Sequence, residues 1–211
     1  MYCDDDVFQD NKKVLDPDDI HLVYAGGVAG SHRNPKQYGN IQFHQIIDIL
    51  SKQKIHFHIY PSPSNIRADY EEYEEIAKKN PFFHFHESVA QNELASELSK
   101  YHFGFHTGFV NQDEHRQSYE KYKYCTTLKI FNFLEAGIPV IISENIIYQS
   151  WILERYKSGI SINKDQLYDL RTIVSRTDYP DLLQAVYSAQ KKLSLKDNAK
   201  RLLGFYNKLA L

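Results

Sequence analysis

The chain has 211 residues, a length at which one domain with a substantial core is expected. Its formal net charge is −2, so it lacks the basic field that attracts nucleic acid. Its apolar runs are far shorter than the ~18 residues of a membrane span, and no signal-peptide pattern is present.

Residues 1–20 differ from the rest of the chain in charge. They hold seven aspartates against Lys12 and Lys13, together with Pro17. This composition is typical of solvated linkers, so we expect a lead-in over 1–20 and a domain over 21–211. Cys3 and Cys125 show no CxxC spacing, which favours a reducing, cytoplasmic setting over a disulfide framework.

Strand and helix patterns alternate from residue 21 to the end of the chain. Short apolar runs predict strands at 21–25, 55–60, 82–86, 103–106, 139–143 and 159–162. Apolar residues at helical spacing predict helices near 43–50, 69–79, 94–101, 126–136, 147–156, 165–175, 180–193 and 197–210. We therefore predict an α/β fold, a Rossmann-like doubly wound parallel sheet with extra C-terminal helices. In such a fold, ligands bind in the loops after the strands.

The helix that ends at Ala136 has an unusual first turn. Thr126 and Thr127 are predicted to cap it, and Gly137 to end it in the left-handed conformation. Lys129 would then oppose the helix macrodipole by ~0.3–1 kcal/mol, a conflict that a bound anion removes. Taken alone, the position favours a lysine that bends outward into solvent.

The segment Lys129–Val140 reads KIFNFLEAGIPV. It resembles the K-x-F-E-Y-L-A-x-G-x-P-V segment in the C-terminal, nucleotide-sugar-binding domain of GT-B glycosyltransferases of the group 1 type. The resemblance covers about residues 20–160 and implies that Lys129 contacts the donor diphosphate. It also implies that the residue three positions later contacts the nucleotide ribose.

Two departures from that segment bear on mechanism. Asn132 stands where the family usually has Glu, and its amide can bond a ribose hydroxyl without charge assistance. Retaining members often carry a further Glu where this chain has Tyr124. The stereochemical course of transfer therefore stays open.

The same resemblance implies further donor contacts in the loops that follow the strands. A plain turn is the alternative for the Gly-Gly pair, and a solvated cation is the alternative for Arg33. The resemblance implies Lys129 as the catalytic residue, which neutralises charge on the leaving diphosphate. The expected binding residues are Gly26, Gly27, Arg33, Glu87, Ser88, Val89, His106, Thr107, Gly108, Thr127 and Asn132.

Four histidines alternate along two predicted strands. His56 and His58 share one face of their strand, as do His84 and His86 on theirs. No carboxylate or cysteine stands in ligand spacing beside them, so we expect sheet-face histidines, no metal site and no cofactor.

The resemblance implies a glycosyltransferase donor domain. It would bind a nucleoside-diphosphate sugar and act with an N-terminal acceptor domain that this chain lacks. Its expected setting is polysaccharide biosynthesis in the cytoplasm, peripheral to the inner face of the membrane and with a lipid-linked acceptor. The main alternative is a noncatalytic α/β interaction or regulatory module. A third is a sugar epimerase, which would need catalytic residues that we do not find in the chain.

Overall fold

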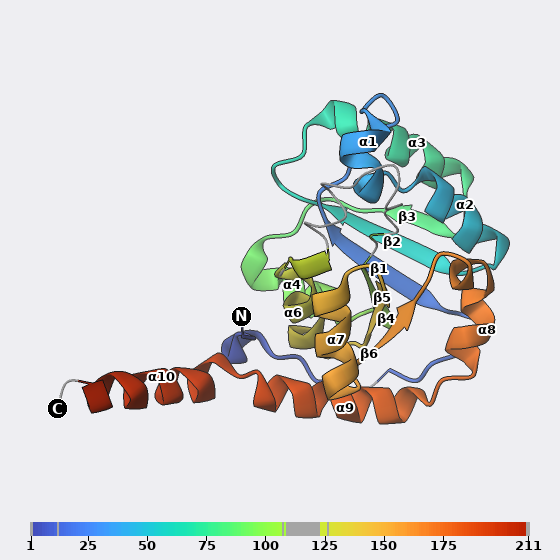
Figure 1. Ribbon diagram of the computed structural model, residues 1–211. Coiled ribbons are helices and arrows are strands. Elements are labelled where there is room, and N and C mark those ends of the chain that lie inside the picture. The colour runs from blue at the N-terminus through green and yellow to red at the C-terminus, as the bar shows by residue number, and fades with distance from the viewer. Residues whose placement is uncertain (1, 12, 107, 109–122, 126, 210–211) are drawn as a thin grey trace.

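The computed structural model describes residues 2–11, 13–106, 108, 123–125 and 127–209. This part of the chain forms a six-stranded sheet in the order β3-β2-β1-β4-β5-β6, with every neighbouring pair parallel (Figure 1). The strands are β1 His21–Gly26, β2 His56–Pro61, β3 Phe83–Phe85, β4 Phe103–His106, β5 Val140–Ser143 and β6 Gly159–Ile162. The predicted parallel, doubly wound α/β fold is confirmed.

Helices cover both faces of this sheet. The first face packs against α2 (His44–Lys52), α3 (Glu71–Lys79) and α8 (Leu170–Ser175). The second packs against α4 (Gln91–Leu98), α6 (Lys129–Glu135), α7 (Ile147–Tyr156) and α9 (Tyr179–Lys192). The remaining elements are α1 (Pro35–Tyr38), α10 (Leu195–Leu209), η1 (Asp5–Val7), η2 (Gly39–Ile41), η3 (Arg67–Asp69) and η4 (Gln166–Asp169).

Side chains alternate between the two faces along each strand. Leu22 and Phe57 lie in the core under α2, whereas Val23 and Tyr60 lie in the core under α4 and α6. This is the period-two alternation expected of strands. The histidines of β1, β2 and β3 therefore share the second face with Val23 and Tyr60.

Close contact between α6 and the sheet depends on a glycine in β4. A Cβ built on Gly104 would lie 2.3 Å from Cγ of Phe133, so the ring of this α6 residue lies directly on the strand backbone. The first turn of α6 is thereby held beside the carboxyl ends of β1 and β4. As predicted, Gly137 follows this helix in the left-handed conformation, with φ of 71°.

The predicted threonine cap of α6 is wrong. Leu128 occupies the N-cap position and makes no side-chain capping bond. The hydroxyl of Thr127 instead donates to Oε1 of Gln149 at 3.2 Å, because this loop packs against α7. Thr126 lies outside the described residues.

The acidic segment at the start of the chain packs on the domain and is not a free lead-in. Cys3 is fully buried and forms an isolated parallel bridge with Ser194. The backbone N–H of Gln9 donates to the carbonyl of Glu135 at 2.8 Å. Most of the aspartates remain at the surface, whereas Cys3, Phe8 and Leu15 pack in or against the core, which overall composition does not reveal.

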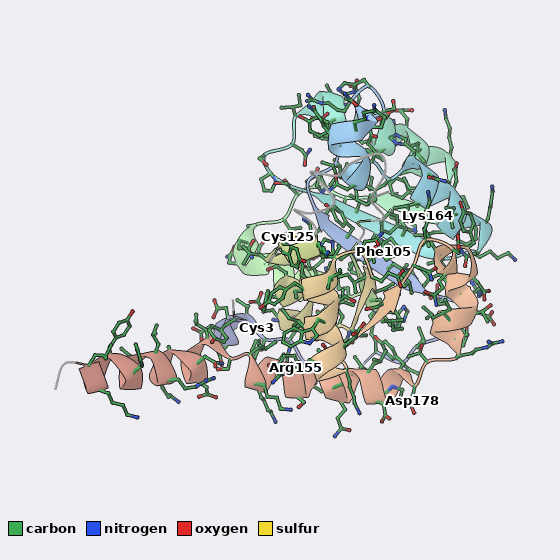
Figure 2. All side chains as sticks on the ribbon, in the orientation of Figure 1. Cys3, Phe105, Cys125, Arg155, Lys164 and Asp178 are labelled. Atoms are coloured by element: carbon green, nitrogen blue, oxygen red, sulfur yellow. The ribbon has the colours of Figure 1, made fainter. Side chains whose placement is uncertain are left out.

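The two cysteines lie in different regions of the molecule (Figure 2). Cys3 packs beside the junction of α9 and α10, and Cys125 lies in the loop that leads into α6. The two cysteines do not form a disulfide with each other. Burial, and the nearby charges of Glu135 and Asp5, raise the pKa of the Cys3 thiol, which therefore stays protonated.

The last helix, α10, leaves the body of the domain (Figure 1). Five of its large apolar side chains are more than half exposed, namely Leu202, Leu203, Phe205, Tyr206 and Leu209. Within the described part of the chain, no helix is both long enough and apolar enough to cross a membrane.

Candidate functional site

The candidate site lies where the order of the parallel strands reverses. β1 pairs with β2 on one side and with β4 on the other, so the chain switches direction across the sheet between β1 and β4. The carboxyl end of β1 is held in register with β2 by Gly26 opposite Pro61, and the N–H of Ser62 donates to the carbonyl of Gly26 at 2.9 Å. Open α/β sheets bind ligands in the crevice at such a switch point.

A pocket of about 310 Å³ opens at this edge, which is within the size range of small-molecule sites. Four of the expected binding residues and the expected catalytic lysine line it, and they come from three separate segments of the chain. They are Gly26, Val89, Thr127, Lys129 and Asn132.

Lys129 is the principal charge in this pocket. Its side chain is partly buried, and no carboxylate of the described residues lies within ion-pair distance of its ammonium. The ammonium Nζ lies 5.6 Å from the ring centroid of Tyr24, a cation–π contact. Burial lowers the pKa of Lys129. A desolvated cation without an acidic partner is a binding element for an anion.

Gly26 lets the lysine pass directly over the backbone. A Cβ at this position would lie 2.7 Å from Cε of Lys129 and 3.0 Å from the hydroxyl of Tyr24, and its φ of 149° is one that side chains rarely adopt. Gly27 has no such constraint, because an added Cβ would meet only Ile41 at 3.9 Å. Its carbonyl accepts a hydrogen bond from Tyr24 at 2.9 Å, and Gly27 does not line the pocket.

His106 ends β4 beneath the same pocket without lining it. Its Nε2 lies 3.5 Å from the hydroxyl of Thr127, and its buried Nδ1 has no hydrogen-bond partner in the described part of the chain. Burial, together with the charge of Lys129, lowers the pKa of His106 to about 3. The imidazole is therefore neutral at physiological pH.

The loop after β3 lines a neighbouring hollow. Glu87 and Ser88 are exposed and border a space of about 430 Å³. This hollow shares residues 61–63 with the first pocket, so the two spaces adjoin. A ligand that extends from Lys129 across residues 61–63 reaches this loop.

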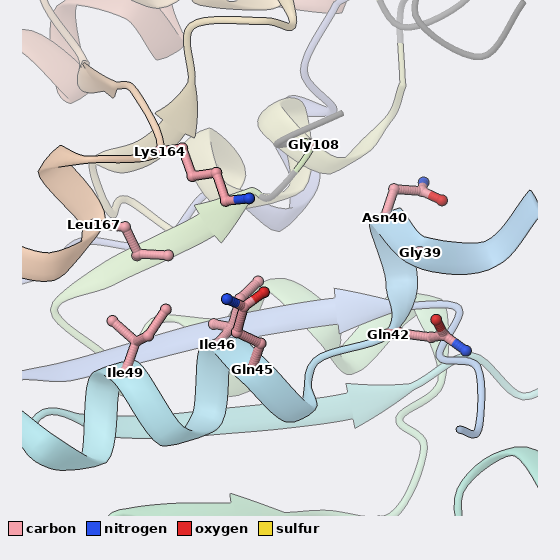
Figure 3. Close-up of a pocket in the computed structure, with 9 residues that line it drawn as sticks. All are labelled: Gly39, Asn40, Gln42, Gln45, Ile46, Ile49, Gly108, Lys164 and Leu167. Carbon is pink, nitrogen blue, oxygen red and sulfur yellow. The ribbon is translucent and has the colours of Figure 1, made fainter. Parts of the chain in front are cut away.

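Gly108 lies apart from these residues. It lines a smaller hollow of about 90 Å³ whose other residues come from η2, α2 and the β6–η4 segment, including Lys164 (Figure 3). Thr107 lies outside the described residues.

Arg33 was expected to bind the donor, but it does not line the pocket. Its guanidinium forms two bonds to the carboxylate of Asp69, from Nε to Oδ1 at 2.6 Å and from Nη2 to Oδ2 at 2.9 Å. This ion pair lowers the pKa of Asp69 and ties the loop after β1 to η3. A bidentate partner leaves Arg33 little capacity for a phosphate, so its role is structural.

Sequence reasoning missed several residues that line the pocket. Tyr60 and residues 61–63 close one side, and Gln91 and Leu94 of α4 close another. The proline-flanked end of the second strand was a usable signal, since parallel strands place their carboxyl ends at one edge. Nothing in the sequence pattern distinguished Gln91 from other exposed helix residues.

The family model for the glucosyltransferase 3-like C-terminal domain matches residues 38–204. The chain belongs to this family. The family match confirms the predicted resemblance to a glycosyltransferase C-terminal domain. No curated protein sequence matches the chain.

Solved glycosyltransferases share the fold of this glucosyltransferase 3-like domain. TarM matches with a TM-score of 0.54 and 16% identity, over 95% of this chain and 38% of TarM. Anabaena Alr3699/HepE, solved in complex with UDP, matches with a TM-score of 0.58 and 11% identity, over 90% of this chain and 49% of HepE. The C-terminal domain of LpcC, a group 1 glycosyl transferase from Francisella tularensis, matches with a TM-score of 0.51 and 14% identity, over 84% of this chain and 87% of that domain.

The chain covers different shares of the lengths of these three solved structures. This glucosyltransferase 3-like domain spans less than half of TarM and of HepE, but most of the isolated LpcC domain. At these identities the likeness is one of fold, and it places the chain among GT-B C-terminal domains.

Proposed function

We propose that this domain binds a nucleoside-diphosphate sugar in the pocket at the carboxyl ends of β1 and β4. The observation that carries the proposal is Lys129, a partly buried cation with no acidic partner among the described residues, lying against the bare backbone of Gly26. The family and the fold support it, and one structural neighbour, HepE, was solved with UDP.

Different residues of the pocket would contact different parts of the donor. Lys129 neutralises the charge that builds on the leaving diphosphate, the electrostatic stabilisation that sugar transfer requires. Asn132 lies one helical turn later and lines the same pocket, where its amide can bond a ribose hydroxyl. Because α6 has only seven residues, the lysine charge supplies more of the anion binding than the helix dipole does.

Transfer needs a second domain that supplies the acceptor. The chain spans 38% of TarM and 49% of HepE, which is consistent with one half of a two-domain enzyme. The exposed apolar residues of α10 are suited to packing against that half. We further propose a cytoplasmic role in polysaccharide biosynthesis at the inner face of the membrane, on a lipid-linked acceptor.

Thermal unfolding in the presence of UDP, GDP, ADP and CMP tests donor binding. One nucleoside diphosphate should raise the unfolding midpoint by about 3–6 °C at ten times its Kd. The Lys129→Ala variant should bind that nucleotide about 10-fold or more weakly, because it loses a charge-assisted contact.

The matched control is Lys52→Ala, which removes an exposed lysine of α2 outside the pocket and should bind like the parent chain. Equal shifts in both variants would contradict the role given to Lys129. A folded chain that no nucleotide shifts at millimolar concentration would favour the noncatalytic module. The Asn132 and Tyr124 departures are the sequence basis of that alternative.

A further inference from the structure

A network of histidines covers part of the second face of the sheet and begins at the amino ends of β1 and β2, opposite the candidate donor pocket. Rings from β1, β2 and β3 stack on one another, with centroid distances of 4.5 Å for His21 and His56 and 4.3 Å for His58 and His84. Hydrogen bonds link His21 to His58 at 2.8 Å and His58 to His86 at 3.0 Å. The proposed function does not use this network.

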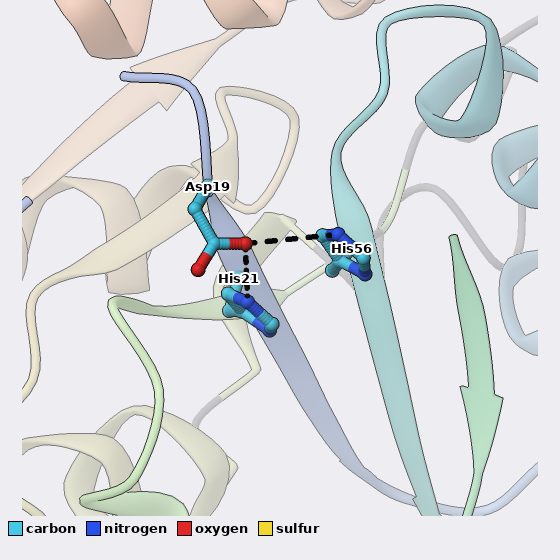
Figure 4. Close-up of side chains that lie close together, drawn as sticks. All are labelled: Asp19, His21 and His56. Carbon is cyan, nitrogen blue, oxygen red and sulfur yellow. Dashed lines mark hydrogen bonds and ion pairs between the residues drawn. The ribbon is translucent and has the colours of Figure 1, made fainter. Parts of the chain in front are cut away.

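At the solvent-exposed end of the network, the carboxylate of Asp19 lies beside the imidazoles of His21 and His56 (Figure 4). Oδ1 of Asp19 lies 2.9 Å from Nε2 of His21 and 3.7 Å from Nε2 of His56. The three ligand atoms lie within 4.8 Å of one another, and all three side chains are partly exposed to solvent. An ion can therefore reach them.

The backbone preorganises this group. His21 and His56 are the first residues of β1 and β2, and they are direct partners in the parallel register. Their side chains leave the same face of adjacent strands, so their spacing is set by the sheet and not by flexible loops. Asp19 lies two residues before His21 and completes the group from the chain entering β1.

A second layer of histidines orients the two imidazoles. Nδ1 of His21 is bonded to Nε2 of His58, and Nδ1 of His56 is bonded to Nε2 of His84 at 2.9 Å. In the tautomer in which both Nδ1 atoms are protonated and donate, both Nε2 atoms are free to coordinate an ion beside Asp19. Metal-bound histidines show this arrangement, in which the second nitrogen donates to a neighbouring group.

We propose that Asp19, His21 and His56 bind a divalent transition-metal ion, with Zn²⁺ the best match to two imidazoles and one carboxylate. The ion occupies the amino ends of β1 and β2 and leaves a coordination position open to water. The sequence argument against a metal rested on the absence of a carboxylate in ligand spacing. Tertiary structure supplies that carboxylate as Asp19.

The ion would act in stability and not in sugar transfer. His21 and Gly26 stand at opposite ends of β1, about 16 Å apart at about 3.3 Å per residue. Bound metal would join the chain entering β1 to the start of β2. This role is independent of the donor site and of the proposed transferase activity.

Calorimetric titration of the chelator-treated chain with Zn²⁺ tests the proposal. One ion should bind per chain, and the unfolding midpoint should rise by about 5 °C or more at 100 times the Kd. Asp19→Asn and His56→Ala should each weaken binding by about 10-fold or more, because even second-layer losses at metal sites cost about 10–100-fold. Mg²⁺, which prefers oxygen ligands, should not bind.

Two variants distinguish loss of the metal site from loss of folding and from a general effect of removing a histidine. Asp19→Asn changes a largely exposed side chain and should leave folding intact, which circular dichroism checks. His32→Ala removes an exposed histidine outside the network and should bind zinc like the parent chain. The proposal is overturned if the chain binds no zinc at about 100 µM, a concentration at which structural sites are saturated. Unchanged affinity in folded Asp19→Asn and His56→Ala, or loss of binding in His32→Ala alone, would also overturn it.

Discussion

Two close contacts of α6 with the sheet depend on residues that have no side chain. Gly26 and Gly104 both admit a neighbouring side chain onto bare backbone, Lys129 in the first case and Phe133 in the second. Both neighbours belong to α6, so these two glycines set how closely that helix approaches the sheet. The position of the candidate donor-binding lysine follows from this approach.

Gly104→Ala should destabilise the domain by about 1–3 kcal/mol, because the new methyl group overlaps the ring of Phe133. The backbone of β4 cannot move without disturbing its pairs with β1 and β5. Urea unfolding measures the change. Gly39→Ala is the matched control: a Cβ there meets no atom within 4 Å, so its effect should stay within about 0.5 kcal/mol. Equal stability of the two variants would contradict the account of how α6 packs.

At the scale of elements, α10 contrasts with α9, the helix before it. Val186 of α9 is fully buried against the second face of the sheet, whereas Leu202 and Phe205 of α10 are 55% and 56% exposed. The start of α10 is held by the acidic segment, with the N–H of Leu195 donating to the carbonyl of Cys3 at 2.9 Å. Beyond this first turn, the apolar face of α10 adds little to the stability of the domain itself.

The double variant Leu202→Glu/Phe205→Glu should therefore change the free energy of unfolding by less than about 1 kcal/mol, as expected for exposed positions. Val186→Ala, which leaves a cavity in the core, should cost about 2 kcal/mol. Chemical unfolding of both variants beside the parent chain provides the comparison. A large loss in the glutamate variant would show that α10 packs on this domain in solution.

At the scale of the whole molecule, several buried imidazoles make stability depend on pH. Burial lowers the pKa of His58 and, with the charge of Lys13, lowers that of His102 to about 4. The pKa of His106 falls to about 3 for the reasons given above. Each is neutral in the folded chain at a pH where the unfolded chain, with its ordinary value of 6.5, takes up a proton.

The free energy of unfolding should therefore fall as the pH drops from about 6.5 toward 4. Lowered histidine pKa values contribute stability above 6.5 that is lost below it, by up to about 1.4 kcal/mol per pH unit for each buried imidazole. Urea unfolding at a series of pH values across this window measures the slope. Stability that is flat or rises toward acid pH would contradict the neutral, buried state of these histidines.

The titration of Glu135 has the opposite effect on the pH dependence of stability, and a substitution at this residue tests that effect. Burial raises its pKa, so the folded chain binds this proton before the unfolded chain does, which favours folding as the pH falls. Glu135→Gln keeps an acceptor for the N–H of Asp4 and removes the titration. Its stability should fall more steeply with acid than that of the parent chain.

Local patterns were sufficient for most of the fold. The six strands, the helix at 147–156 and the turn at Gly137 were predicted because apolar spacing and glycine conformation act over a few residues. The threonine cap was wrong, because Thr127 finds its partner far away in the chain. For the same reason the sequence pattern did not reveal that Cys3 packs on the domain or that Arg33 is paired with Asp69, 36 residues later.

The sequence by itself determined the alternation of strands and helices, the family motif at Lys129 and the edge of the sheet where a ligand would bind. These depend on residue spacing, which the chain carries without reference to distant contacts. Tertiary structure alone decided which loops line the pocket with Lys129, which cation is already paired, and that Asp19 joins His21 and His56. Those facts depend on strand order and register, which bring together side chains from separate segments of the chain.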